Sequence, residues 1–100
     1  MKNNVIAKTT VYLGLVDKNQ VAIDHEKVSD FVTTELMELP GYTTWLAHGA
    51  WQDYREPTMV VSCSGNEFVD TMKALAAKYR DEFNQDSVML DVVESQLQFI

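Results

Sequence analysis

The side chains of this sequence that could act as a general acid or base are few, and two of them stand in apolar surroundings. His48 falls inside an extended apolar run, and a histidine titrates close to neutral pH, as a general base requires. Asp91 interrupts another apolar run, and an acid that faces a closed cavity is typical of an active site. Both have simpler explanations, since His48 can lie at the edge of a core and Asp91 can face water. His25, near the expected start of a helix, is interpreted as a solvated residue.

Other kinds of chemistry find less support. The sequence contains no nucleophile motif, no glycine-rich phosphate loop and no spacing typical of metal ligands, so we expect no cofactor. The single cysteine, Cys63, excludes an internal disulfide and a cysteine-based metal site, and its apolar neighbours place it in a core. Tyr54, Arg55 and Glu56 are either a solvated turn or a binding contact at the tip of a hairpin.

The composition predicts one folded domain, residues 1–100, with 46% hydrophobic residues. The net charge of -7 argues against direct contact with nucleic acid or with an anionic membrane, because both bind basic surfaces. The first residues lack the apolar stretch of a signal peptide, and no run is long enough to span a bilayer. We therefore expect a cytoplasmic protein, in the host cytoplasm if a phage encodes it.

Hydrophobic periodicity predicts strands and helices in a regular order. Strand-like alternation covers 5–16, 43–51, 58–63 and 87–93, helical spacing covers 24–39 and 64–84, and alternation returns at 96–100 as an extension or an edge strand. Asp24 is a candidate N-cap and Pro40-Gly41 a stop signal for the first helix, while Ser64 and Glu67 match a capping box for the second. The order β-α-β-β-α-β predicts an α+β, ferredoxin-like sandwich, a four-stranded antiparallel sheet with two helices on one face.

The central hairpin decides which side chains share a face of this sheet. A polar turn at 52–57, with Pro57 as the first residue of the next strand, would pair Trp51 with Thr58 and Gly49 with Val60. The face covered by the helices would then include Leu46 and Ala50. The uncovered face would take Tyr12, Gly14, Val16, Trp45, Gly49, Trp51, Val60, Met89, Asp91 and Val93.

The uncovered face carries aromatic side chains where a sheet that faces water would alternate in polar residues. A patch of this kind indicates an interface or a ligand groove. In one interpretation a second copy of the chain, or residues 97–100 folded back, covers the face. In the other, gaps at Gly14 and Gly49 admit a planar ligand. A dimer whose two sheets enclose a cavity satisfies both interpretations.

Three groups of residues resemble a known family. They are Thr10-Val11-Tyr12-Leu13-Gly14-Leu15, then Gly49-Ala50-Trp51 with Arg55-Glu56-Pro57-Thr58, and Tyr79-x-x-x-Phe83-x-Gln85-x-Ser87-Val88. Their combination is similar to a family of small bacterial and phage proteins defined as a domain of unknown function, number 3574, from about residue 9 to residue 93. The resemblance implies a ferredoxin-like domain, no particular activity, and a shared site at Tyr12, Gly14, Gly49, Trp51, Arg55 and Glu56. Many bacterial relatives look exported or lipid-anchored, whereas the absence of an export signal here suits a phage or cytoplasmic version.

Two functional hypotheses follow. The leading one is a small non-enzymatic binding protein that uses the uncovered face for self-association as a homodimer, for a small-molecule ligand, or for both. As a phage protein it would inhibit a host protein or sequester a signalling molecule. The expected ligand and interface residues are Tyr12, Gly14, Trp45, Gly49, Trp51, Tyr54, Arg55 and Glu56. The alternative is a cofactor-free isomerase or lyase of the dimeric α+β barrel type, with His48 or Asp91 as general base.

Overall fold

The computed structural model describes residues 5–100, without the side chains of Trp51 and Tyr54. Its elements are β1 (Val5–Gly14), α1 (His25–Glu35), β2 (Thr43–Trp51), β3 (Tyr54–Ser64), a 3₁₀ turn η1 (Asn66–Phe68), α2 (Val69–Glu82) and β4 (Met89–Gln96). The predicted order of strands and helices is therefore confirmed. Neither the extension nor the edge strand expected at 96–100 forms, since β4 ends at Gln96 and residues 97–100 have no regular secondary structure.

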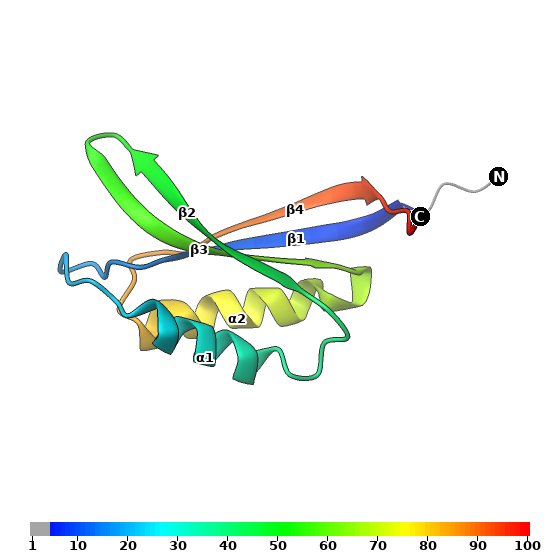
Figure 1. Ribbon diagram of the computed structural model, residues 1–100, viewed down its shortest axis with the longest axis horizontal. Helices are drawn as coiled ribbons and strands as arrows, with labels where there is room; N and C mark the ends of the chain where they lie inside the picture. Colours follow the sequence, from blue (N-terminus) through cyan, green and yellow to red (C-terminus); the bar gives the residue numbers. More distant parts are fainter. Residues whose placement is uncertain (1–4) are drawn as a thin grey trace.

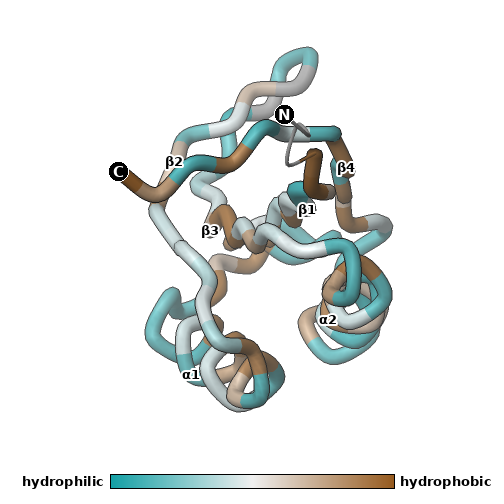
Figure 2. The backbone as a smooth tube through the Cα atoms, turned by 90° about the vertical axis from the view of Figure 1, so that its right-hand side faces the viewer, coloured by the Kyte–Doolittle hydropathy of each residue, from teal (hydrophilic) through white to brown (hydrophobic). Residues whose placement is uncertain are grey.

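The strands form one sheet in the order β2-β3-β1-β4, with every neighbouring pair antiparallel. Both helices lie beneath the same face of this sheet (Figure 1), and the view along the layers shows the same separation (Figure 2). This is the ferredoxin-like α+β arrangement that the sequence predicts. No helix between residues 5 and 100 has the length and apolarity that crossing a bilayer requires.

The hydrophobic core lies between the sheet and the helices. Alternate residues of β1 and β3 point into it, because side chains on a strand alternate between faces. Helix α1 contributes residues at helical spacing, and α2 does the same. The largest fully buried side chains are Tyr79, Leu13, Leu36, Met72, Val11, Val28, Val32, Val61 and Thr9. Cys63 is buried as expected; burial and then the charge of Glu67 raise the pKa of its thiol, so it is a poor nucleophile.

The ends of the helices differ in detail from the prediction. Asp24 caps α1 as expected, because its carboxylate accepts a hydrogen bond from the Glu26 amide at 3.1 Å. The helix stops at Glu35, before the predicted stop at Pro40, because Leu36 leaves helical geometry and turns the chain towards β2. The predicted capping box is wrong: Ser64 is the last residue of β3, and η1 precedes α2 without a side-chain cap.

The hairpin is longer than predicted, because the turn consists of Gln52 and Asp53 alone, with Gln52 in the left-handed region at φ 54°. Trp51 pairs with Tyr54, and Gly49 pairs with Glu56 instead of Val60. The register has moved by an even number of residues, so the predicted faces are preserved.

Pro57 lies within β3 and not at its start, and its position is explained by a local exchange of hydrogen bonds. The Pro57 carbonyl accepts from the Leu15 amide at 2.9 Å. Proline has no N–H to return this bond, and the Leu15 carbonyl accepts instead from the Ile23 amide at 2.8 Å. The Leu15 and Pro57 carbonyls and the Leu15 amide therefore all have hydrogen-bond partners, despite the missing N–H of Pro57.

The end of the hairpin extends beyond the helices and bends away from them (Figure 1). Leu46 and Ala50 were expected on the face of the sheet that the helices cover, but both are exposed. Their side of the strand is correct, but neither helix reaches that far. The hairpin is thus an arm that rises on the side of the uncovered face.

Candidate functional site

The carboxyl end of β1 is the point where polar side chains from three other segments meet. Tyr79 of α2 donates its hydroxyl hydrogen to the Gly14 carbonyl at 2.5 Å. Glu56 of β3 accepts a hydrogen bond from the Val16 amide at 3.3 Å. Gln85, between α2 and β4, donates its amide to the Val16 carbonyl at 3.1 Å. We call these residues, Gly14, Val16, Glu56, Tyr79 and Gln85, the Gly14 site.

The absence of a side chain at Gly14 makes room for this arrangement. A Cβ built on Gly14 would collide with Glu56 Oε1 and would lie 2.9 Å from Gln85 Oε1. The carboxylate and the amide therefore share the space above Gly14, on the uncovered face of the sheet. The gap that the sequence predicted at Gly14 is filled by these two side chains. At Gly49 a Cβ would find ordinary contacts, the nearest being Thr58 Oγ1 at 3.5 Å.

The orientation of the Gln85 side chain follows from its hydrogen bonds. Its Nε2 donates to the carbonyls of Val16 and Phe83, both at 3.1 Å. Because two carbonyls require a donor, the nitrogen must face them and Oε1 must face Glu56. Two acceptor oxygens thus converge above Gly14, one of them on a half-buried carboxylate.

An aromatic cluster beneath the sheet holds Tyr79 in place. Its ring stacks on Phe83 with centroids 4.6 Å apart, and Phe31 meets both rings edge-on at 5.8 Å and 5.2 Å. Burial, and secondarily the charge of Glu56, raise the pKa of Tyr79, so its hydroxyl remains a neutral donor to Gly14. The cluster and this hydrogen bond fix the end of β1, against which the side chain of Glu56 from β3 lies.

The uncovered face next to the Gly14 site carries a row of large side chains across the sheet. Met89, Tyr12, Val60 and Trp45 are neighbours in the strand pairing. Val60 is only 2% exposed, although no helix covers this face. Trp45 and Met89 remain 45% and 61% exposed. This row is therefore apolar and partly exposed, whereas Thr10, Ser62 and Asp91 on the same face are polar, and the described indole does not lie beneath a helix.

The two candidate bases lie apart from this arrangement and from each other. His48 is exposed on β2, opposite Pro57 and on the side of the helices. Asp91 is exposed on β4, opposite Thr10 and on the uncovered face. β2 and β4 are the opposite edges of the sheet. A role for either residue as general base stays a prediction without support from a neighbouring catalytic group.

The remaining predicted residues divide between the two faces of the hairpin. Arg55 is exposed and lies opposite Ala50, on the face away from Glu56. Gly49 lies directly opposite Glu56. Trp51 and Tyr54 pair through their backbones at the end of the hairpin, and their side chains lie outside what the structure describes.

Sequence reasoning missed two members of the Gly14 site. Tyr79 and Gln85 were not among the expected site residues. A signal for both existed in the motif Tyr79-x-x-x-Phe83-x-Gln85, which was used only for the family resemblance. The spacing places the aromatic rings one turn apart on α2 and Gln85 just after its end.

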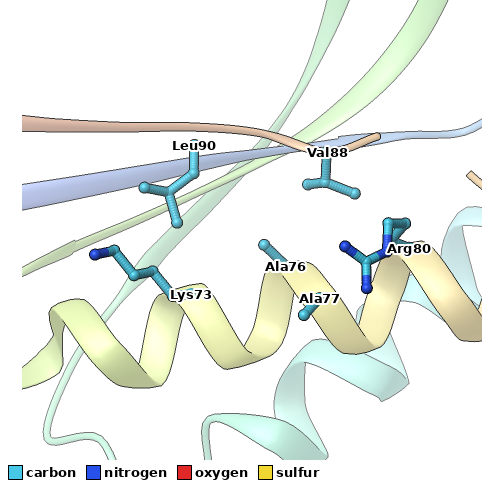
Figure 3. Close-up of a pocket in the computed structure, with 6 residues that line it drawn as sticks. All are labelled: Lys73, Ala76, Ala77, Arg80, Val88 and Leu90. Atoms are coloured by element: carbon cyan, nitrogen blue, oxygen red, sulfur yellow. The ribbon is translucent and has the colours of Figure 1, made fainter. Parts of the chain in front are cut away.

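Two shallow hollows in the described part of the chain lie away from the Gly14 site. One, of about 210 Å³, separates α2 from β4 and has Lys73 and Arg80 beside Val88 and Leu90 (Figure 3). The other, of about 390 Å³, includes Asp17, Asp24 and Lys27. Neither includes His48 or Asp91.

The Gly14 site is built from all three groups of residues that carried the family resemblance. A family model described as "Protein of unknown function (DUF3574)" matches residues 8–99. The chain belongs to the DUF3574 family. The expected family is therefore confirmed. No curated protein sequence matches this DUF3574 chain at a significant level.

Two solved structures share the fold of this DUF3574 protein. A phage SAM lyase in complex with S-methyl-5'-thioadenosine is 16% identical, with a TM-score of 0.71 over 95% of this chain and 92% of that chain. A phage SAM lyase in the apo state is 18% identical, with a TM-score of 0.64 over 100% of this chain and 98% of that chain. At this identity the likeness establishes the fold.

The likeness to an enzyme corrects the leading functional hypothesis. A small non-enzymatic binding protein was inferred from the small size, the acidity and an aromatic face without catalytic spacing. The two matching structures are of a lyase, and they share the fold of this chain. The absence of catalytic spacing is therefore no argument against an enzyme of this fold, and the comparison favours the alternative hypothesis, a cofactor-free isomerase or lyase, over the leading one.

Proposed function

We propose that this protein is a cofactor-free lyase that cleaves a carbon–sulfur bond of S-adenosylmethionine (SAM) on the uncovered face, next to the Gly14 site. The observation that carries the proposal is the half-buried Glu56 carboxylate, held above Gly14 within a fold that a phage SAM lyase shares. A carboxylate in this position suits a cationic substrate. The net charge of -7 also favours the approach of a cation.

The chemistry follows from the two molecules named with the fold. SAM is a sulfonium cation whose sulfur carries methyl, adenosyl and aminocarboxypropyl groups. S-methyl-5'-thioadenosine retains the first two groups, so the bond between sulfur and the γ-carbon of the third must break. The sulfur keeps the electron pair and becomes a neutral thioether. The γ-carbon gains a new bond either from the carboxylate of the same substrate, which closes a lactone, or by loss of a proton from the adjacent carbon, which forms an alkene.

Neither route requires an oxidant, a reductant or a cofactor, and orientation of the flexible aminocarboxypropyl chain is the main demand on the protein. Glu56 is suited to this role because the Val16 amide fixes its carboxylate. In the ring-closing route Glu56 only binds and orients the substrate. In the alkene route it also accepts the proton. The aromatic rings of Tyr12 and Trp45 lie on the same face and offer stacking surfaces for the adenine base.

The proposal predicts that the purified protein converts SAM into S-methyl-5'-thioadenosine and that Glu56→Gln lowers kcat/KM about 100-fold. The amide keeps an oxygen for the Val16 amide but removes the negative charge. Product formation is followed by liquid chromatography. A wild-type protein that releases no S-methyl-5'-thioadenosine would contradict the proposal. Asp91→Asn and His48→Asn are assayed in parallel, and an equal loss in either would return the general-base role to that residue.

We also propose that a second copy covers the uncovered face and encloses the substrate. The exposed side chains of Trp45, Met89 and Val93 give this face apolar surface, and a substrate bound there would otherwise remain in water. Two sheets that face each other around a cavity provide both the cover and the low dielectric in which the Glu56 charge acts most strongly on its ligand.

Self-association through this face predicts that Trp45→Ala reduces the molecular mass in solution. The indole buries about 150–250 Å² when it is covered, so its loss should weaken a dimer by about 10-fold or more. Light scattering after size exclusion measures the mass over a dilution series. Leu46→Ala is the matched control, because Leu46 is 58% exposed on the opposite side of the same strand. A monomeric wild type, or equal effects of the two substitutions, would exclude this interface.

A further inference from the structure

The space above Gly14 is bordered by two acceptor oxygens, one from Glu56 and one from Gln85. A Cβ at Gly14 would collide with Glu56 Oε1 and would lie 2.9 Å from Gln85 Oε1, so both oxygens border the same small volume. Glu56 Oε1 receives one hydrogen bond, from the Val16 amide at 3.3 Å. The Gln85 nitrogen is committed to the carbonyls of Val16 and Phe83, which leaves its oxygen directed at Glu56.

Two acceptors in this arrangement repel each other unless a donor lies between them. Carboxylate and amide oxygens together accept from a group that has several hydrogens and a positive charge, and an ammonium group has both properties. A neutral hydroxyl has one hydrogen and satisfies only one of the two oxygens. Within residues 5–100 no lysine or arginine side chain makes a hydrogen bond or an ion pair with either oxygen. Lys78 pairs with Glu35 and Arg80 with Asp81, while Arg55 lies on the other face of β3.

We infer that Glu56 and Gln85 together bind the α-ammonium group of the aminocarboxypropyl chain of the substrate. This inference rests on the proposed function and assigns one part of the substrate to one part of the site. Gln85 is then a specificity residue. It recognises the amino acid portion of the ligand and makes no contact that a nucleoside thioether without an amine would need.

The position of Gln85 explains how a loop residue can serve this role. It follows α2 directly, after Asn84 in the left-handed region at φ 53°, and its backbone amide bonds the Arg80 carbonyl at 3.0 Å. Both the backbone and the side chain of Gln85 are thus tied to neighbouring carbonyls. The amide oxygen is held in place before the ligand arrives, which reduces the entropy lost on binding.

Calorimetric titration with two adenosine thioethers tests the inference. S-adenosylhomocysteine carries the ammonium group and no sulfonium, and S-methyl-5'-thioadenosine carries neither. We expect Gln85→Met to weaken the binding of S-adenosylhomocysteine about 10-fold and to change that of S-methyl-5'-thioadenosine by less than about 2-fold. Gln98→Met is the matched control, because Gln98 is exposed and lies after β4, and it should change neither.

Glu56→Gln is the second variant, in case Gln85→Met fails to fold. It keeps the shape of the side chain and removes the charge. It should therefore weaken the binding of S-adenosylhomocysteine by about 10-fold or more and leave the binding of S-methyl-5'-thioadenosine unchanged. Equal losses for both ligands would overturn the inference, because the pair would then bind the nucleoside. Unchanged binding of S-adenosylhomocysteine would also overturn it. In both cases the proposed lyase would survive. A wild type that binds neither thioether would remove the inference and the proposed function together.

Discussion

Alanine at position 14 should lower the kcat/KM of the proposed SAM cleavage by at least about 100-fold. The added methyl group would take the place of Glu56 Oε1 and press on Gln85 Oε1, so the carboxylate would have to leave the Val16 amide. Gly14 is not among the residues with positive φ, so the effect comes from lost space and not from backbone strain. Chromatographic measurement of S-methyl-5'-thioadenosine release gives the rate.

Gly41→Ala is the control for this substitution, because a Cβ there meets nothing within 4 Å. Both substitutions reduce the entropy of the unfolded chain by the same amount. A difference in rate or stability between the two variants therefore arises from contacts in the folded protein. Circular dichroism and thermal unfolding establish that each variant folds. A Gly14→Ala protein that folds and retains the wild-type rate would show that the reaction takes place elsewhere on the molecule.

Tyr79→Phe should lower the free energy of unfolding by about 1–3 kcal/mol at neutral pH, because the Gly14 carbonyl loses the donor beneath it. The ring itself remains within the cluster of Phe31 and Phe83, so packing is kept. Urea denaturation measures the difference. A variant as stable as the wild type would mean that water or another donor replaces the hydroxyl at no cost.

The same substitution predicts a change in the pH dependence of stability. Burial and the charge of Glu56 raise the pKa of Tyr79 above the usual tyrosine value of about 10. Above about pH 10 the unfolded chain releases this proton while the folded protein keeps it. The stabilisation is therefore complete below about pH 10 and is lost as the pH rises further. The difference in the free energy of unfolding between wild type and Tyr79→Phe should therefore narrow above about pH 10. A difference in the free energy of unfolding that stays constant with pH would contradict the assignment of a buried, neutral hydroxyl to Tyr79.

The fold could be predicted because its signals are local. The alternation in β1 and β3 and the helical spacing of Val28 and Val32 each arise from a short stretch of chain. The faces of the hairpin were also correct, although its register was not. An even shift leaves inside and outside unchanged, so the pattern cannot distinguish the two registers. The turn at Gln52 and Asp53 decided between them.

The site was predicted only in part, for a reason that particular residues make clear. Gly14 and Glu56 were named because they occur in motifs, whereas Tyr79 looked like an ordinary core residue and Gln85 like a loop residue. Arg55, next to Glu56 in sequence, lies on the other face because neighbours along a strand point in opposite directions.

Periodicity and turn residues were thus sufficient for the strand and helix order, the layers and the apolar uncovered face, since each depends on interactions between residues close in sequence. The meeting of Glu56, Gln85 and Tyr79 at one glycine depends on strand register, on the end of α2 and on which strands are neighbours. These are set by packing between segments 40–69 residues apart in the chain, and no local pattern carries that information.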